Sequence, residues 1–318
     1  MHMADALVSP PVAAVAGVAA ASLLVIATRK VARSRRSDII PMMGVMGAFV
    51  FAAQMINFSI PGTGSSGHII GGVLLAAFLG PWAAYLTLCS VLIVQCLVFA
   101  DGGLMALGCN MINMAAMSAL VGYPLIYRPL IKYPSSTGRI MCASVLACVL
   151  SLEAGALLVS AETVASGITA LPLGKFLMFM LPIHLAIGIC EGVATGLVVA
   201  FVQRYNAPLL TDSADTTAAG TSGGRRRVLW GFGIAAFVLA VAFTWIASAN
   251  PDGLEWSIEK VAGVAELAPA SVPDTAFMPD YESHFAGIVG GVLVMITLWA
   301  VTTLMFRRRR QAVTRRIK

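Results

Sequence analysis

The first two residues of the chain, Met1 and His2, hold three nitrogen atoms that can bind one metal ion. These are the terminal amine, the backbone amide of His2 and the His2 ring, which together close two adjacent chelate rings. With one more nitrogen from elsewhere, this set suits a square-planar ion such as Ni(II) or Cu(II). The first dozen residues contain no Lys or Arg, and no cleavage site ends the apolar run that follows, so we expect this start to be retained. The alternative is that His2 is simply the second residue, or a cloning remnant, with no role.

His68 is the natural fourth nitrogen, because it follows a loop, 57–67, that we expect on the same side of the membrane as Met1. The glycines and small hydroxyls of this loop let the backbone approach a small ligand closely. The loop is no phosphate-binding loop, since it lacks the Gly-Lys-Ser/Thr ending. The alternative is a structural histidine near a helix start. The residues expected to line or support the metal pocket are Asn57, Thr63, Ser66, Gly67, Asn110 and Asn113.

Asn110 and Asn113 are three apart and share a helix face, so they hold either a ligating ring or a neighbouring helix. His184 and Glu191 are seven apart and point to one side of a later apolar run. An ionisable pair in a membrane span is a metal ligand, a proton relay or an interhelix lock. Glu191 should lie about 10 Å deeper than His184, so they are no close pair, and we favour a structural or gating role for Glu191.

Composition places the chain in lipid. It is 58% hydrophobic and 11% charged, with a mean hydropathy of +0.87, whereas a soluble domain carries about 25% charged residues. The net charge of +6 is therefore better explained by basic cytoplasmic loops than by nucleic-acid binding. No nucleotide motif and no convincing catalytic constellation is present, so any ATP-driven step needs another subunit. An intramembrane hydrolase built on Glu191 or His184 lacks a second catalytic group.

The apolar runs predict an all-α integral membrane protein with about nine transmembrane helices. Only the dipeptide Gly80-Pro81 separates the third run from the fourth, which predicts a tight helical hairpin. Nearly all Lys and Arg residues lie on alternate connections, which predicts an outside N-terminus and a cytoplasmic C-terminus. The runs are 10–28, 38–58, 68–80, 82–100, 104–127, 140–160, 174–202, 228–249 and 285–306.

A polar segment rich in small residues, 206–227, predicts a flexible cytoplasmic linker. It separates a seven-helix unit, 1–205, from a two-helix unit, 228–318. The two-helix unit has a long outside loop, 250–284, that contains the sequence PDGLE at 251–255.

Several short motifs in this order resemble one known family. They are Met1-His2 with Ser9-Pro10-Pro11-Val12, Gln54 to Phe58, Ser66-Gly67-His68, Gly102-Gly103-Leu104 with Leu107 to Asn110, and Glu191-Gly192. Together they resemble the nickel/cobalt substrate-binding (S) components of energy-coupling-factor (ECF) transporters, the CbiM/NikM family, over about 1–205. The PDGLE sequence resembles the small accessory N component, so the chain resembles a fusion of the two. Ala4 and Ala6 depart from the family's start, where Pro and Gly are usual.

The resemblance implies that Ni(II) or Co(II) is bound by the Met1 amine, the His2 amide and ring, and the His68 ring. It also implies ATP-dependent uptake across the bacterial plasma (inner) membrane, powered by a membrane T subunit and two cytoplasmic ATPase subunits that this chain does not contain. The fused arrangement favours nickel. The competing hypothesis is a secondary metal/proton transporter that uses His184 and Glu191.

Overall fold

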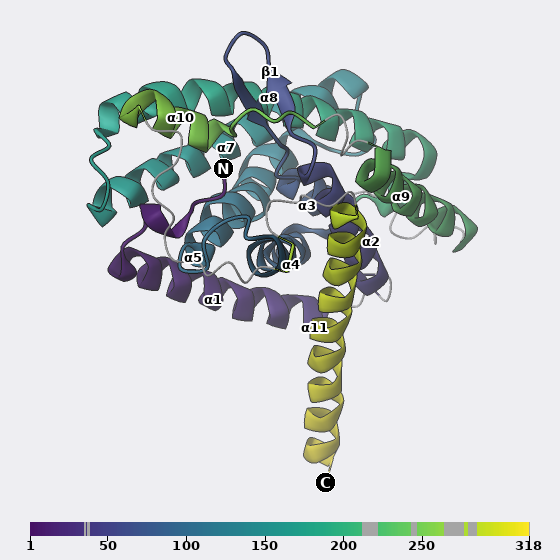
Figure 1. Cartoon of the computed structure of the whole chain (residues 1–318). Coiled ribbons are helices and arrows are strands. Elements are labelled where there is room, and N and C mark those ends of the chain that lie inside the picture. The colour runs from purple at the N-terminus through teal and green to yellow at the C-terminus, as the bar shows by residue number, and fades with distance from the viewer. Residues whose placement is uncertain are drawn as a thin grey trace.

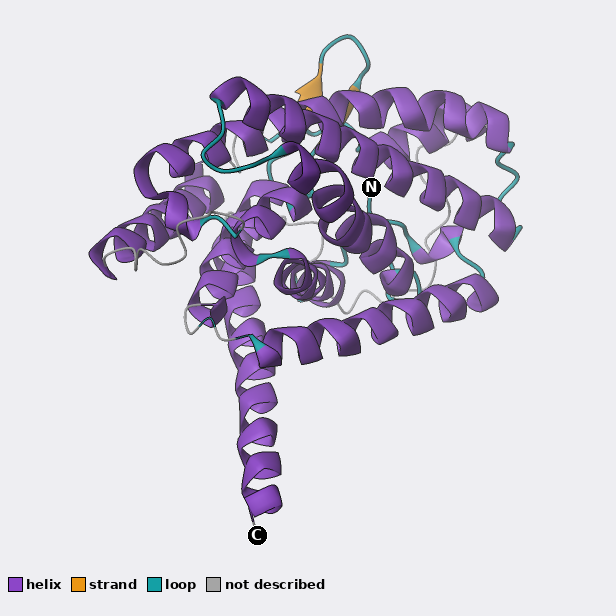
Figure 2. Cartoon of the chain, turned by 180° about the vertical axis from the view of Figure 1, so that it is seen from behind, coloured by secondary structure: helices purple, strands orange, loops and turns teal. Residues whose placement is uncertain are grey.

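The computed structural model describes residues 1–34, 36, 39–211, 222–242, 247–263, 277–278 and 285–317. Most of the linker expected at 206–227, and much of the loop expected at 250–284, lie outside the described residues. The described chain is almost entirely helical, with one small β-hairpin (Figures 1 and 2). The all-α prediction is confirmed at this level.

Each predicted apolar run contains a helix. The longer helices are α1 (Pro10–Arg33), α2 (Ile39–Gln54), α4 (Pro81–Phe99), π-helical η2 (Met111–Tyr127), α7 (Thr137–Ser166), α8 (Leu173–Asn206), α9 (Ser222–Ala242) and α11 (Ala286–Ile317). The shorter elements are η1 (Asp5–Leu7), β1 (Phe58–Ile60), β2 (Ser65–Gly67), α3 (Gly72–Leu79), α5 (Leu107–Asn110), α6 (Arg128–Leu130), η3 (Ala207–Leu209) and α10 (Gly253–Ala262).

Six of the described helical segments are long and apolar enough to cross a membrane. They are Pro10–Arg33, Pro81–Phe99, Leu107–Leu130, Thr137–Ser166, Leu173–Leu209 and Ala286–Thr303. The eight residues of α3 are too few, because a span needs about 20. The protein is thus an integral membrane protein, while nine crossings and the orientation of the termini stay predictions. The tight turn at Gly80 between α3 and α4 is confirmed.

The cytoplasmic ends predicted for the first and seventh runs lie together. A guanidinium nitrogen of Arg36, just after α1, donates to the carbonyl of Phe78 at 3.1 Å. The backbone amide of Thr211, just after α8, donates to the carbonyl of Ala77 at 2.8 Å. Both acceptors are at the C-terminal end of α3, so the basic ends of α1 and α8 share one side of the bundle. The N-terminal segment precedes α1 and His68 precedes α3, so both lie at the opposite ends of these helices.

Helices α7 and α8 pack as a long antiparallel pair with their backbones in close contact (Figure 1). A Cβ atom added at Gly188 would lie 2.8 Å from Cα of Val149, and one at Gly192 would lie 2.4 Å from Cα of Val145. Small residues at such crossings let membrane helices approach closely. This packing fixes the height and rotation of α8, and with them the positions of His184 and Glu191.

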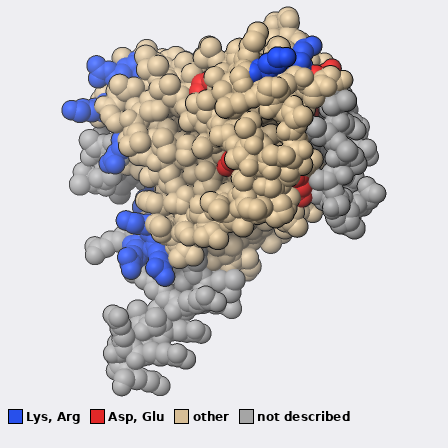
Figure 3. Space-filling view, turned by 90° about the vertical axis from the view of Figure 1, so that its left-hand side faces the viewer, with Lys and Arg blue, Asp and Glu red and all other residues tan. Residues whose placement is uncertain are grey.

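The two-helix unit is attached in two ways. Helices α9 and α11 pack against α2, whereas the short helix α10 packs against α8. In Figures 1 and 2, α11 runs steeply across the direction of α1 and extends beyond the rest of the molecule. Figure 3 shows a face on which Lys and Arg lie at the margins, whereas the wide area between them is mostly uncharged and carries a few Asp or Glu side chains.

Candidate metal centre

The N-terminal segment is threaded into the helical bundle. Met1 is 5% exposed and Met3 is fully buried. The amide of Met3 donates to Oδ1 of Asn110 at 2.8 Å, and Nδ2 of Asn110 donates back to the Met3 carbonyl at 3.2 Å. Asn113 donates through Nδ2 to Oε2 of Glu162 at 2.6 Å and lies 3.6 Å from Sδ of Met3. The two asparagines therefore hold the segment that carries the amine, rather than a ligating ring.

A turn of glycines closes over the same segment. The amide of Gly103 donates to the carbonyl of Met3 at 2.9 Å, and Oδ1 of Asp5 accepts from the amide of Ala106 at 2.9 Å. Gly102 has a φ of 87°, which disfavours any residue with a side chain. A Cβ at Gly103 would lie 1.9 Å from Oδ1 of Asp5 and 2.4 Å from its backbone nitrogen. Only glycine fits where the chain passes this closely.

His2 and His68 meet directly, as the sequence analysis expected. Their rings stack with centroids 5.2 Å apart and an angle of 18° between the planes. Nδ1 of His2, the atom that would close the chelate ring, lies 3.1 Å from Oδ1 of Asp101. Nδ1 of His68 lies 3.1 Å from the carbonyl of Ile69; since a carbonyl only accepts, this nitrogen carries the proton.

Burial keeps both rings in the form that binds metals. It lowers the pKa of His2, against the opposing effect of Asp101. Burial, with the nearby Met1 ammonium, lowers the pKa of His68 to about 3. A neutral imidazole has a free lone pair, whereas an imidazolium has none. Both rings are therefore ready to bind a cation at neutral pH.

The PDGLE sequence reaches this site. Asp252 caps α10: its Oδ1 accepts from the amides of Leu254 and Glu255 at 2.8 Å each, and Glu255 accepts from the Asp252 amide at 3.0 Å. This capping box leaves Oδ2 free, and Oδ2 lies 2.5 Å from the Met1 amine. Burial would raise the pKa of Asp252, but the Met1 ammonium lowers it below the usual range.

The β1–β2 hairpin holds the PDGLE segment in place. The amide of Ser66 donates to the carbonyl of Pro251 at 2.8 Å, and its hydroxyl donates to the carbonyl of Asn250 at 2.8 Å. Nε1 of Trp256 donates to the carbonyl of Thr63 at 3.0 Å. The carbonyl of Asn57 accepts from the amide of Ser248 at 2.7 Å. Asn57, Thr63 and Ser66 thus bind the two-helix unit, and they support the pocket through it.

Glu191 positions the stretch that follows His68. Its two carboxylate oxygens accept from the amides of Ile70 and Gly71 at 2.9 Å each. Gln54 adds a bond from Nε2 to the carbonyl of Ile70 at 2.7 Å. Both oxygens of Glu191 are engaged in this structural contact, which agrees with the structural role favoured for it.

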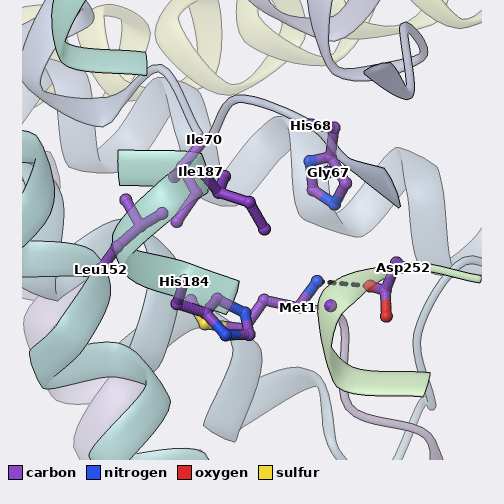
Figure 4. Close-up of a pocket in the computed structure, with 9 residues that line it drawn as sticks. Met1, Gly67, His68, Ile70, Leu152, His184, Ile187 and Asp252 are labelled. Atoms are coloured by element: carbon purple, nitrogen blue, oxygen red, sulfur yellow. Dashed lines mark hydrogen bonds and ion pairs between the residues drawn. The ribbon is translucent and has the colours of Figure 1, made fainter. Parts of the chain in front are cut away.

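A small cavity lies between these elements, with room for about one water molecule or ion (Figure 4). Gly67 forms part of its wall, and a Cβ there would lie 2.5 Å from Cγ1 of Ile187. The other lining residues are Met1, His68, Ile70, Leu152, His184, Ile187, Asp252 and Gly253.

No three His, Cys, Asp or Glu side chains among the described residues converge well enough to hold a metal ion. Side chains alone therefore do not complete a site in this part of the chain. The remaining donors nearby are the Met1 amine and the backbone nitrogen of His2, which is the set that the chelate requires.

Sequence reasoning did not assign site roles to Asp101, Asp252 or Glu162. A signal existed for Asp252, because Asp and Glu three residues apart before an apolar stretch mark a capped helix start. That signal locates the helix, but it gives no hint that the second carboxylate oxygen faces Met1.

Residues 2–209 match the family model described as the cobalt uptake substrate-specific transmembrane region, CbiM. The chain belongs to the CbiM family. Residues 226–307 match the PDGLE domain, so this CbiM chain is fused to a second domain that contains α10.

Relatives with the same fused arrangement cover most of this CbiM chain. A putative fused nickel transport protein NikMN from Archaeoglobus fulgidus is 30% identical over 85% of this chain and 88% of its own length. The fused nickel transport protein NikMN of Rhodobacter capsulatus is 31% identical over 94% of this chain and 86% of its own length. A crystal structure of a truncated transition metal transporter is similar with a TM-score of 0.56 and 34% identity. The superposed region covers 64% of this chain and 99% of the transporter chain.

Proposed function

We propose that this chain captures Ni(II), or Co(II), as the substrate-binding component of an ECF-type uptake transporter. The four ligands are the Met1 amine, the His2 amide nitrogen, the His2 ring and the His68 ring. The observation that carries the proposal is the buried N-terminus, whose His2 ring stacks on the ring of His68. The relatives named as nickel transport proteins support the substrate.

The charges around the donors suit a dication. The Met1 amine is paired with Asp252, and Nδ1 of His2 faces Asp101. Binding displaces both carboxylates from these nitrogens, releases protons from the amine and the amide, and shifts the proton on Nδ1 of His2 to Nε2. The carboxylates then lie close to the bound cation and offset part of its charge. In this proposal the PDGLE domain holds the amine in place until the metal arrives.

The remaining parts of the proposal follow from the sequence. We propose a seven-helix metal-binding unit over 1–205, a linker over 206–227 and a two-helix unit over 228–318. The metal site faces the outside of the bacterial plasma membrane, opposite the basic connections. A T-type membrane subunit and two cytoplasmic ATPase subunits supply the energy for uptake.

A secondary metal/proton transporter would need Glu191 as a proton carrier between two compartments. Both oxygens of Glu191 accept backbone amides in a fixed loop. This arrangement favours anchoring over exchange, so we do not adopt that alternative.

The proposal is tested by titrating the purified chain with Ni(II) and Co(II), with and without one residue added before Met1. We expect the extended protein to lose tight binding, because the amine moves away from the chelate. A single residue added after Lys318 is the matched control and should leave binding unchanged. Tight binding that survives the N-terminal extension would overturn the amine ligand.

Each imidazole ligand has its own test. Replacing a residue that only supports a metal ligand typically lowers metal affinity by about 10- to 100-fold. His2→Ala and His68→Ala should each weaken Ni(II) binding by more than this. Thermal unfolding of each metal-free variant checks that the fold is retained. The native complex should be yellow and diamagnetic, as a square-planar Ni(II) complex is. Wild-type affinity in either variant would contradict the ligand set.

A further inference from the structure

The ring of His184 is buried in the bundle and is not among the ligands proposed above. It is 1% exposed and projects from α8, whose Pro182 lies two residues earlier. Its Nδ1 lies 2.7 Å from the carbonyl of Met180, one turn back on the same helix. Because a carbonyl oxygen can only accept, Nδ1 carries the proton and Nε2 holds a free lone pair.

That lone pair has no partner among the described residues. Nε2 of His184 is buried, and no group in the described part of the chain bonds to it. Buried polar atoms in folded proteins are nearly always paired, so an orphaned nitrogen calls for a water or an ion. The ring is held in this orientation, because Nδ1 bonds to the carbonyl of Met180.

The ring faces the cavity of the metal centre. His184 is one of its lining residues, together with His68, Met1 and Asp252. Figure 4 shows Met1 between His184 and Asp252, with His68 above them. His2 is not a lining residue of this cavity. The cavity is therefore a position next to the four-nitrogen chelate, and His68 borders both.

We propose that Nε2 of His184 is a further metal ligand, which binds Ni(II) or Co(II) in this cavity together with His68. The inference rests on the proposed function, since it takes the same ions as substrate. A neutral imidazole whose second nitrogen donates to a backbone carbonyl is the usual form of a histidine ligand for such ions. Here the carbonyl of Met180 supplies that orienting bond.

The shared ligand gives the ion a way inward. As the ion moves from the chelate to the cavity, its bonds to the Met1 amine, the His2 amide and the His2 ring break. The amine and the amide each take up a proton, and the ammonium pairs again with Asp252. The bond to His68 remains while the bond to His184 forms, so the ion is never without a protein ligand.

The test uses the purified full chain with His2→Ala, which removes a chelating ring but leaves His68 and His184. Isothermal titration with Co(II) measures the remaining affinity. We expect tight binding to be lost and one weaker site per chain to remain. Adding His184→Gln should weaken this site by tenfold or more.

A control variant separates loss of a ligand from other effects. Gly138→Ala, in the His2→Ala background, adds a Cβ in the first turn of α7 that meets nothing within 4 Å, and it should leave Co(II) affinity within threefold. X-ray absorption on Co(II)-loaded His2→Ala protein should count two imidazoles, which tests the inference even if His184 variants do not fold.

The outcomes distinguish the two claims. Wild-type affinity in the His2→Ala protein overturns the proposed chelate, whatever happens at His184. Loss of all binding in that protein, one imidazole in the absorption spectrum, or equal Co(II) affinity with and without His184 overturns the inference alone.

Discussion

Replacing Gly103 with alanine should weaken metal binding although the residue lies outside the ligand set. The new Cβ would stand 1.9 Å from Oδ1 of Asp5 and 2.4 Å from the Asp5 backbone nitrogen. The N-terminal segment must retreat by about 1 Å or more to restore an ordinary contact. The backbone of Gly103 itself needs no positive φ, so the effect is one of packing alone.

Overpacking of this kind costs about 1–3 kcal/mol. The N-terminal segment can relieve the clash by moving away from the Gly102–Gly103 turn, which takes Met1 and His2 away from His68. The cost then appears as a loss of Ni(II) affinity of about 5- to 150-fold. The assay is calorimetric titration of the purified variant, with its melting temperature measured in parallel.

The matched control for Gly103→Ala is Gly138→Ala. Gly138 lies in the first turn of α7, and a Cβ there meets nothing within 4 Å. We expect unchanged affinity and equal or slightly higher stability, since alanine favours helix over glycine by about 0.5–1 kcal/mol. Unchanged Ni(II) affinity in Gly103→Ala would refute the idea that this turn holds the chelating segment.

Three further predictions concern the supports of the site. Glu191→Gln leaves one buried amide after His68 without its acceptor, so we expect about 1–3 kcal/mol lower stability and weaker Ni(II) binding in calorimetry; unchanged values would show that the carboxylate is dispensable. Trp256→Phe removes the bond to the carbonyl of Thr63 and should lower the melting temperature by the equivalent of about 0.5–1.5 kcal/mol, an effect absent if that bond is not formed. The metal-free protein should lose stability as the pH falls from about 6.5 towards 3, because burial lowers the pKa of His68 to about 3 and only the unfolded chain takes up the proton. His68→Gln should make this loss smaller, and an identical pH profile would contradict the argument.

Much of the centre could be predicted because its chemistry is local. The chelating nitrogens of Met1 and His2 belong to two adjacent residues. His68 was expected on the same side of the membrane as Met1, because basic residues lie on alternate connections. The structure brings these three residues together. The apolar runs also located the helices, because length and composition decide which segments enter lipid.

The supports of the centre could not be predicted in the same way. Thr63 and Ser66 were expected near the ion, but they bind the segment around PDGLE through hydrogen bonds between side chains and backbone carbonyls, which no sequence pattern records. Asp252 meets Met1 through the packing of α10 on α8. The π-helical winding of η2 after Asn110 also has no signature in its apolar sequence.

The residues that bind the N-terminus determine how early in synthesis its contacts can form. Met1 leaves the ribosome first, but its carboxylate partner follows 251 residues later, and Asn110, which binds Met3, follows 107 residues later. Contacts between residues so far apart form late in folding, because the intervening chain must first be ordered. A chain still in synthesis therefore lacks the Met1–Asp252 pair until the start of α10 has been made.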